Sequence, residues 1–141
     1  MVKHVLFDAS ALFKRYSGEA GAARVHALYE ASERISLAAH CKAELASALT
    51  RQWRAQLFTD AEYRRVLATI HSDFEGVEVQ PLDGEVEFNA IAAMRLAPLR
   101  GMDALHIASA QVARVDLFVT ADQHQAEAAR AAGVTTELIT A

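Results

Sequence analysis

The stretch RGMDALHIASAQVARVDLFVTAD, residues 100–122, joins the two kinds of segment that predict the fold. Residues 100–113 are predicted to form a helix, and residues 116–121 are an apolar run typical of a buried strand. Asp103 stands in the first turn of the helix among apolar neighbours, and Asp122 directly follows the strand. An acid at either place is a helix cap or a chemical group, and the positions of the other acids help to decide which.

The same alternation of short β-type runs and longer helical runs extends over the whole chain. Strands are expected at 4–8, 34–39, 77–82, 116–121 and 135–140, and helices at 9–16, 21–32, 40–53, 59–74, 84–96, 100–113 and 122–133. Strands that alternate with helices imply parallel pairing with helices on both faces of the sheet. We therefore predict an α/β fold, a three-layer α/β/α sandwich with a mostly parallel central sheet, in one domain over residues 1–141.

Composition limits the classes of protein that need to be considered. The 141 residues are 52% hydrophobic and 23% charged, which is an ordinary globular balance. The net charge of -4 argues against a general basic coat for nucleic acid, but not against a nuclease with an acidic site. Cys41 is the single cysteine, and no apolar run reaches membrane-spanning length. We expect a cytoplasmic protein without an intrachain disulfide, a signal peptide or membrane association.

Four acids fall where the predicted strands end. Asp8 closes the first strand, Glu44 lies in the first turns of the helix after the second strand, and Asp122 follows the fourth. Asp103 opens the helix that leads into that fourth strand, which should bring it to the same edge. Ligands bind at the carboxyl ends of strands in open α/β sheets. We therefore expect the four carboxylates to share one cleft.

Each acid also has a simpler interpretation when it is taken alone. Aspartate is a preferred N-cap, Asp122 with Gln125 fits a capping box, and Glu44 could be an exposed helix residue. These interpretations do not explain the convergence of all four. Carboxylates brought together repel one another unless cations share them, and Mg²⁺ and Mn²⁺ prefer oxygen ligands.

The segments that carry these acids resemble the four acidic motifs of the PIN-domain ribonucleases, and most closely those of VapC-type toxins. They are VLFDASALFKRY, HCKAELASAL, MDALHIASA and LFVTADQH. The resemblance covers almost the whole chain in the right order, and the four motifs are specific only as a set. One departure is that Gln125 and Ala126 stand where many relatives have a further acid, which leaves occupancy of a second metal site open.

The resemblance implies a metal-dependent endoribonuclease that acts as the toxin of a toxin–antitoxin pair. It implies Mg²⁺ or Mn²⁺ as cofactor, held by Asp8, Glu44, Asp103 and Asp122, with accessory hydroxyls from Ser10 and Thr120. The metal would activate water for phosphodiester hydrolysis of single-stranded or loop RNA. The implied partners are an RNA substrate, a cognate antitoxin and a second copy of the chain in a homodimer.

Basic and apolar residues complete the predicted contacts. The candidates for RNA binding are Lys14, Arg15, Lys42 and Arg100, all close in sequence to an acid. Residues 11–16 and the helix pair around Trp53 and Phe58 are expected to offer apolar surface for self-association.

Other interpretations stay open at this stage. His40 with Glu44, and Asp103 with His106, have spacings that would suit a transition metal, although we expect His106 to pack or hydrogen-bond near the cleft. Cys41 and His40 are adjacent on a helix and should not face each other, which argues against a nucleophilic pair. A small-molecule α/β enzyme would need a glycine-rich phosphate loop that the sequence lacks. A PIN-like module that binds RNA or a partner without efficient cleavage is the main alternative.

Overall fold

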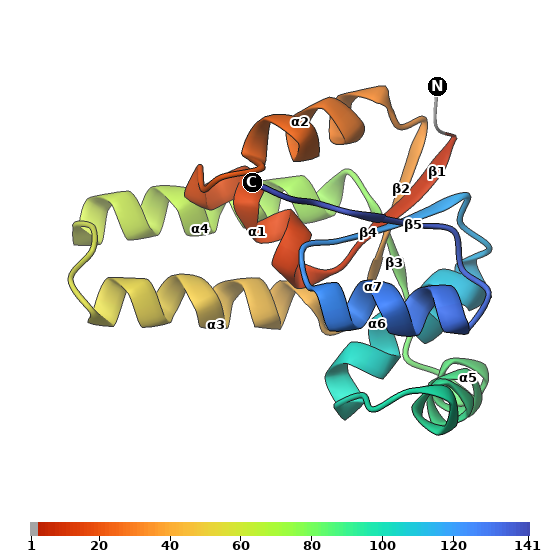
Figure 1. The fold of residues 1–141 in the computed structure, drawn as a ribbon. Helices are drawn as coiled ribbons and strands as arrows, with labels where there is room; N and C mark the ends of the chain where they lie inside the picture. The colour runs from red at the N-terminus through yellow and green to blue at the C-terminus, as the bar shows by residue number, and fades with distance from the viewer. Residues whose placement is uncertain (1–2) are drawn as a thin grey trace.

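The computed structural model describes residues 3–141, which fold into five strands and seven helices in alternation (Figure 1). The strands are β1 (His4–Phe7), β2 (Arg34–Ala38), β3 (Glu78–Gln80), β4 (Leu117–Thr120) and β5 (Thr136–Leu138). The helices are α1 (Ala9–Ser17), α2 (Ala22–Ala31), α3 (Cys41–Arg54), α4 (Asp60–Glu75), α5 (Gly84–Leu96), α6 (Gly101–Ala113) and α7 (Gln123–Ala131).

The strands form one sheet in the order β3-β2-β1-β4-β5, and each pair of neighbours runs parallel. From β1 the chain builds β2 and β3 on one side and then returns to add β4 and β5 on the other. Strand order therefore reverses between β1 and β4. A crevice outside the carboxyl ends of the strands is expected at such a reversal, and it is the usual ligand site of this architecture.

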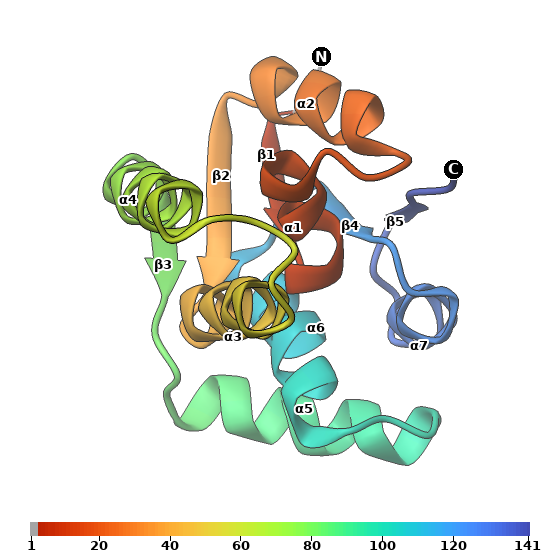
Figure 2. The ribbon, with the colours of Figure 1, turned by 90° about the vertical axis from the view of Figure 1, so that its left-hand side faces the viewer.

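Helices cover both faces of the sheet, which confirms the predicted three-layer α/β/α fold. In β1, Val5 and Phe7 pack in the main core with residues of α1, α2, α3 and α4, while Leu6 packs on the opposite face with residues of α5, α6 and α7. Figure 2 shows α1 to α4 gathered on one side of the strands. Val5, Leu6 and Phe7 are all 0% exposed, because a parallel strand between two helical layers is apolar on both faces.

Helices α3 and α4 form a hairpin that projects beyond the sheet (Figure 1). The predicted capping box is present at the start of α4, where Thr59 and Glu62 bond to each other's backbone. The Trp53 and Tyr63 rings stack with their centroids 5.0 Å apart. At the other end of α4, Asp73 accepts a hydrogen bond from the Tyr16 hydroxyl at 2.7 Å, which ties α4 to α1.

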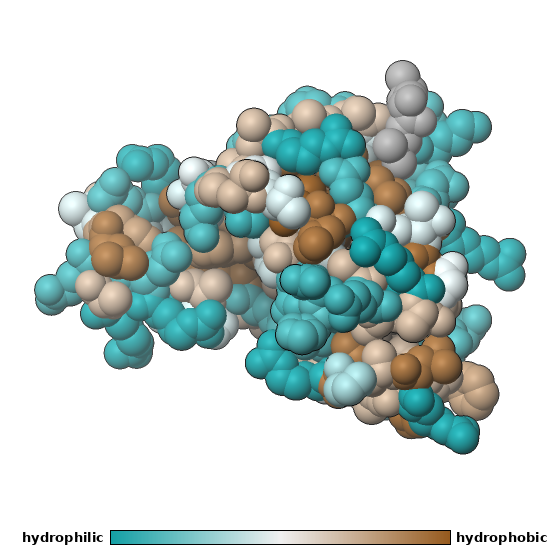
Figure 3. All heavy atoms as spheres, viewed as in Figure 1, coloured by the Kyte–Doolittle hydropathy of each residue, from teal (hydrophilic) through white to brown (hydrophobic). Residues whose placement is uncertain are grey.

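The expectation that residues 11–16 offer free apolar surface is wrong. Leu12 is only 1% exposed, and Phe13 and Tyr16 pack against the main core. Trp53 and Phe58 are half-buried. The exposed large apolar side chains of residues 3–141 lie instead on α5, in the chain around it and at the α3–α4 turn; they are Leu57, Val79, Leu82, Phe88, Ile91, Met94, Leu96 and Met102. Figure 3 shows hydrophobic atoms over the α5 region.

None of the helices described over residues 3–141 combines the length and the apolar character needed to cross a membrane.

Candidate active site

One pocket of about 550 Å³ lies where β1 and β4 end, and Asp8, Glu44, Asp103 and Asp122 all line it. Asp8 follows β1 directly, and Asp122 follows β4 after one intervening residue. Glu44 comes from the first turn of α3, and Asp103 from the first turn of α6. Four acids that are far apart in sequence are thus brought to the crevice at the strand-order reversal.

Asp8 is the most buried of the four acids, at 4% exposed, and its side chain caps α1. Its Oδ1 accepts hydrogen bonds from the Ala11 backbone at 3.0 Å and the Ser10 hydroxyl at 2.7 Å, and its Oδ2 accepts one from the Thr120 hydroxyl at 2.5 Å. Burial raises the pKa of the Asp8 carboxyl, and the opposing effects of His106 and of these hydrogen bonds do not cancel it. The ionised form therefore favours a nearby cation.

Ser10 and Thr120 join the end of β1 to the end of β4. Besides donating to Asp8, the Ser10 hydroxyl accepts a bond from the Ala121 backbone at 3.0 Å, and that of Thr120 accepts one from the Asp122 backbone at 3.1 Å. The two hydroxyls are 3.3 Å apart. They fix the position of Asp8 relative to the loop that carries Asp122.

Asp122 is the N-cap of α7, as its simpler interpretation predicted. Its Oδ1 accepts hydrogen bonds from the backbone of His124 at 2.8 Å and of Gln125 at 3.2 Å. The expected capping box is absent, because the Gln125 side chain donates instead to the Asp103 carbonyl at 2.9 Å. Gln125 is 2% exposed, so the place where many relatives carry another acid serves here to join α7 to α6.

Asp103 is not a helix cap. The N-cap of α6 is Arg100, which makes no side-chain capping bond, and Asp103 lies three residues further on. The carboxylate instead pairs through Oδ2 with Arg100 Nε at 3.2 Å.

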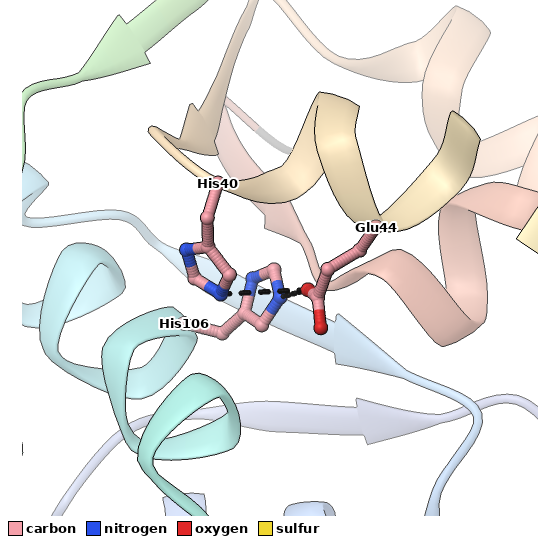
Figure 4. Close-up of side chains that lie close together, drawn as sticks. All are labelled: His40, Glu44 and His106. Atoms are coloured by element: carbon pink, nitrogen blue, oxygen red, sulfur yellow. Dashed lines mark hydrogen bonds and ion pairs between the residues drawn. The ribbon is translucent and has the colours of Figure 1, made fainter. Parts of the chain in front are cut away.

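Glu44 is held by two histidines (Figure 4). Its Oε1 lies 2.5 Å from His106 Nε2 and 3.4 Å from His40 Nε2. Burial opposes ionisation of Glu44, but the hydrogen bond and charge of His106, with the charge of His40, outweigh it and lower the pKa of the carboxyl. Burial and the charge of His106 lower the pKa of His40. His106 is 2% exposed and hydrogen-bonds at the cleft, as predicted from the sequence.

Each of the four carboxylates has an oxygen with spare capacity to accept a ligand. Glu44, Asp103 and Asp122 are held in place through one oxygen, whereas Asp8 is held through both. No residue within 3–141 donates a hydrogen bond to Glu44 Oε2, Asp103 Oδ1 or Asp122 Oδ2, and Asp8 Oδ2 receives only the bond from Thr120. Fixed carboxylates with open oxygens around one pocket are a donor set that suits Mg²⁺ or Mn²⁺.

Two of the four basic candidates lie at the pocket and two do not. Lys14 and Arg100 line it. Arg15 instead pairs with Asp73 at 3.2 Å and stacks on an aromatic ring of α2. Lys42 lines a different hollow on the far side of α3.

Sequence reasoning missed Arg51, which also lines the pocket. It lies seven residues after Glu44 on α3, two helical turns along the same face, and this spacing is a signal that could have indicated it. Ser47 and Glu19 line the pocket as well.

The family model of the PIN domain matches residues 5–131. The chain belongs to the PIN-domain family. No match to this PIN domain was found among curated proteins.

Solved structures share its fold. VapC20 of Mycobacterium tuberculosis, described as a sarcin-ricin loop cleaving toxin, has a TM-score of 0.67 at 16% identity, with 88% of this chain and 94% of that one covered. DNA-bound VapBC of Salmonella typhimurium has a TM-score of 0.67 at 18% identity, and the match covers 99% of this chain and 100% of that one. A toxin–antitoxin complex of Klebsiella pneumoniae has a TM-score of 0.60 at 19% identity, and the match covers 86% of this chain and 88% of that one. At these identities the likeness shows a common fold.

Proposed function

We propose that this PIN domain is a metal-dependent endoribonuclease and the toxin of a type II toxin–antitoxin pair. The observation that carries the proposal is the set of four carboxylates around one pocket, all held in place and three of them with an oxygen that accepts no hydrogen bond from residues 3–141. A structural role would leave no reason to gather them, because like charges in a partly buried pocket repel one another.

The carboxylates and the hydroxyls of the site would have different roles in phosphodiester hydrolysis. Asp8, Glu44, Asp103 and Asp122 would hold Mg²⁺ or Mn²⁺, which supplies an activated water and neutralises developing charge when bound. Ser10 and Thr120 keep the most buried acid, Asp8, in a fixed orientation.

Three cations at the pocket suit a phosphate backbone. Lys14, Arg51 and Arg100 line the same cavity as the acids, so they could bind phosphates on either side of the bond that is cut. The description of VapC20 as a sarcin-ricin loop cleaving toxin supports RNA as the substrate class, in single-stranded or loop form. We keep Arg15 and Lys42 only as distal contacts, because neither lines the pocket.

A cognate antitoxin and a homodimer complete the proposal, with the whole of residues 1–141 as one cytoplasmic nuclease domain. Two structural neighbours are a toxin–antitoxin complex and a DNA-bound VapBC, which supports an antitoxin partner. We expect the antitoxin to insert a basic side chain among the acids, since a cation there replaces the charge of the metal. The exposed apolar residues around α5 are available to self-association.

The alternative is a PIN module that binds RNA or a partner without efficient cleavage. One observation favours this alternative. The buried Gln125 cannot supply the further carboxylate that many relatives have at this position.

Incubation of the purified protein with structured RNA tests the proposal. Cleavage should require Mg²⁺ or Mn²⁺, stop in EDTA, and fall by about a hundredfold or more in Asp8→Asn and Asp103→Asn. Asp60→Asn is the matched control, because Asp60 pairs with Arg64 on the exposed face of α4. Cleavage that persists in EDTA would contradict the metal dependence, and binding of RNA without any cleavage would support the alternative.

A further inference from the structure

We infer that His40, Glu44 and His106 form a separate site for a zinc-like transition-metal ion, and that an ion bound there lowers the affinity of Glu44 for a cation in the acidic pocket. The site itself is argued from geometry alone. Its consequence for RNA cleavage rests on the proposed function.

The three side chains already converge. One ligand atom from each lies within 4.8 Å of the other two, and among residues 3–141 this is the one such group of three. His40 is the N-cap of α3 and Glu44 lies four residues further along, and His106 reaches them from α6 (Figure 4). The two imidazole rings have their centroids 4.2 Å apart. Glu44 and His106 are 62 residues apart in the sequence, and the fold brings their side chains together.

Tetrahedral coordination needs a modest rearrangement of these side chains. His40 Nε2 must give up its 3.0 Å hydrogen bond with the Met102 carbonyl to bind the ion. Bonds of roughly 2.0–2.1 Å to Zn²⁺ put neighbouring donors ~3.3 Å apart. Glu44 Oε1 and His40 Nε2 are already 3.4 Å apart, while Glu44 Oε1 and His106 Nε2 are 2.5 Å apart and must open slightly. Glu44 has a half-exposed, unbranched side chain that can make this adjustment.

The donor set selects a different ion from the one proposed for the pocket. Two imidazole nitrogens and one carboxylate are a zinc ligand set that leaves the fourth position for water. Imidazole suits zinc, copper and nickel, whereas Mg²⁺ prefers oxygen alone. Histidine binds such an ion in its neutral form.

An ion can reach the group from solvent. A second hollow of about 310 Å³, lined in part by Glu44, Met102 and Asp103, opens beside the acidic pocket. Binding through Nε2 would move the ring proton of His106 to Nδ1, a buried atom without a hydrogen-bond partner in the described chain. That proton is poorly accommodated, so the ion should bind reversibly rather than as a permanent structural metal.

Competition for Glu44 gives the site a function. Glu44 Oε1 already faces the two histidines, so a transition ion coordinated through it leaves Oε2 at the acidic pocket but places a positive charge beside that oxygen. Mg²⁺ in the acidic pocket would then be bound strongly by only three of the four carboxylates. A transition-metal ion should therefore inhibit cleavage in the presence of excess Mg²⁺, and a chelator selective for it should restore the activity.

Calorimetric titration of the metal-free full-length protein with ZnCl₂ tests the site without RNA. We expect one Zn²⁺ per chain, and Co²⁺ in its place should give the intense visible absorption of a tetrahedral complex. His40→Gln and His106→Gln should each weaken Zn²⁺ binding by about tenfold or more. His71→Gln is the matched control, because His71 is exposed on α4 away from the group, and it should bind as the wild type does.

Two further comparisons keep the outcomes distinct. Asp122→Asn should retain Zn²⁺ binding, since Asp122 lies outside the three-residue group; loss of binding in this variant would place the ion in the acidic pocket and overturn the inference. Wild-type affinity in His40→Gln, the half-buried position where folding is least at risk, would overturn it as well. If no RNA is cleaved under any condition but Zn²⁺ binds through the two histidines, the proposed function fails while the metal site stands.

Discussion

Replacing Asp8 with asparagine should stabilise the metal-free protein and destabilise the metal-loaded protein relative to wild type. Asp8 is 4% exposed, and burial raises the pKa of its carboxyl. Asparagine is about as good an N-cap as aspartate, so the bond from the Ala11 backbone survives. The Ser10 and Thr120 hydroxyls both also accept hydrogen bonds, and they can rotate to meet the new amide.

The changes in stability that Asp8→Asn should cause without metal and with metal have opposite signs and comparable size. Without metal, removal of a buried, poorly neutralised charge should raise the free energy of unfolding by on the order of 1 kcal/mol at pH 7. Mn²⁺ at about 100 times its Kd stabilises the wild type by roughly 2.7 kcal/mol, and the variant should lose most of that gain. For a chain of this size 1 kcal/mol corresponds to a Tm shift of about 4 °C. The order of the two melting temperatures should therefore invert between EDTA and Mn²⁺.

The effect in EDTA should also depend on pH in a definite direction. Because the native pKa of Asp8 is raised, the native state binds this proton more tightly than the unfolded chain, whose carboxyl has its ordinary pKa of 3.8. The contribution of Asp8 to stability is thus complete at acidic pH and is lost as pH rises through the raised native pKa. The advantage of Asp8→Asn should be small near pH ~4 and grow toward pH ~7.

Thermal melts followed by circular dichroism, in EDTA and in saturating Mn²⁺ at several pH values, decide the matter. Asp60→Asn again serves as the control, with no inversion expected. The reasoning would be refuted if Asp8→Asn were less stable than wild type in EDTA at pH ~7. It would also be refuted if Mn²⁺ raised the Tm of Asp8→Asn as much as it raises the Tm of the wild type.

Three further changes give distinct outcomes. Asp103→Asn should leave the Tm in EDTA nearly unchanged, because Asp103 does not cap α6, yet abolish most of the Mn²⁺ shift in the same melts. Tyr16→Phe removes the 2.7 Å bond to Asp73 and should lower the free energy of unfolding in urea by about 1.5 kcal/mol, with RNA cleavage rates unaffected. Gly21→Ala should destabilise the fold by more than about 1 kcal/mol in the same titration, because Gly21 has a φ of +94° and an added Cβ would lie 2.7 Å from the Ile139 side chain.

The sequence predicted the fold because its signals are local. Apolar runs such as 116–121 stand out from the helical segments around them, and the strand observed at Leu117–Thr120 differs only at its ends, where boundaries are least defined. Alternation of strand and helix then restricts the sheet to parallel pairing. The convergence of the four acids follows from the same facts, since three of them stand just past strand ends.

Side-chain direction could not be predicted in the same way. Each residue turns a helix by about 100°, so basic residues that adjoin an acid in sequence can face elsewhere. Lys42 lies two residues before Glu44 and lines another hollow, whereas Arg51, seven residues after it, lines the pocket. The capping box at Asp122 failed for a related reason, because a tertiary partner, the Asp103 carbonyl, was available to Gln125.

Capping does not exclude the metal-ligand role proposed for Asp8 and Asp122. A carboxylate has two oxygens, and in both residues Oδ1 accepts backbone N–H groups of a helix, while Oδ2 accepts only the Thr120 hydroxyl in Asp8 and no hydrogen bond from residues 3–141 in Asp122. The helix N-terminus, with its partial positive charge, also favours the ionised form that a metal requires. Capping would thus hold a proposed metal ligand in place before any ion arrives. Asparagine preserves the cap and removes the charge, so only a comparison with and without metal can separate the two contributions.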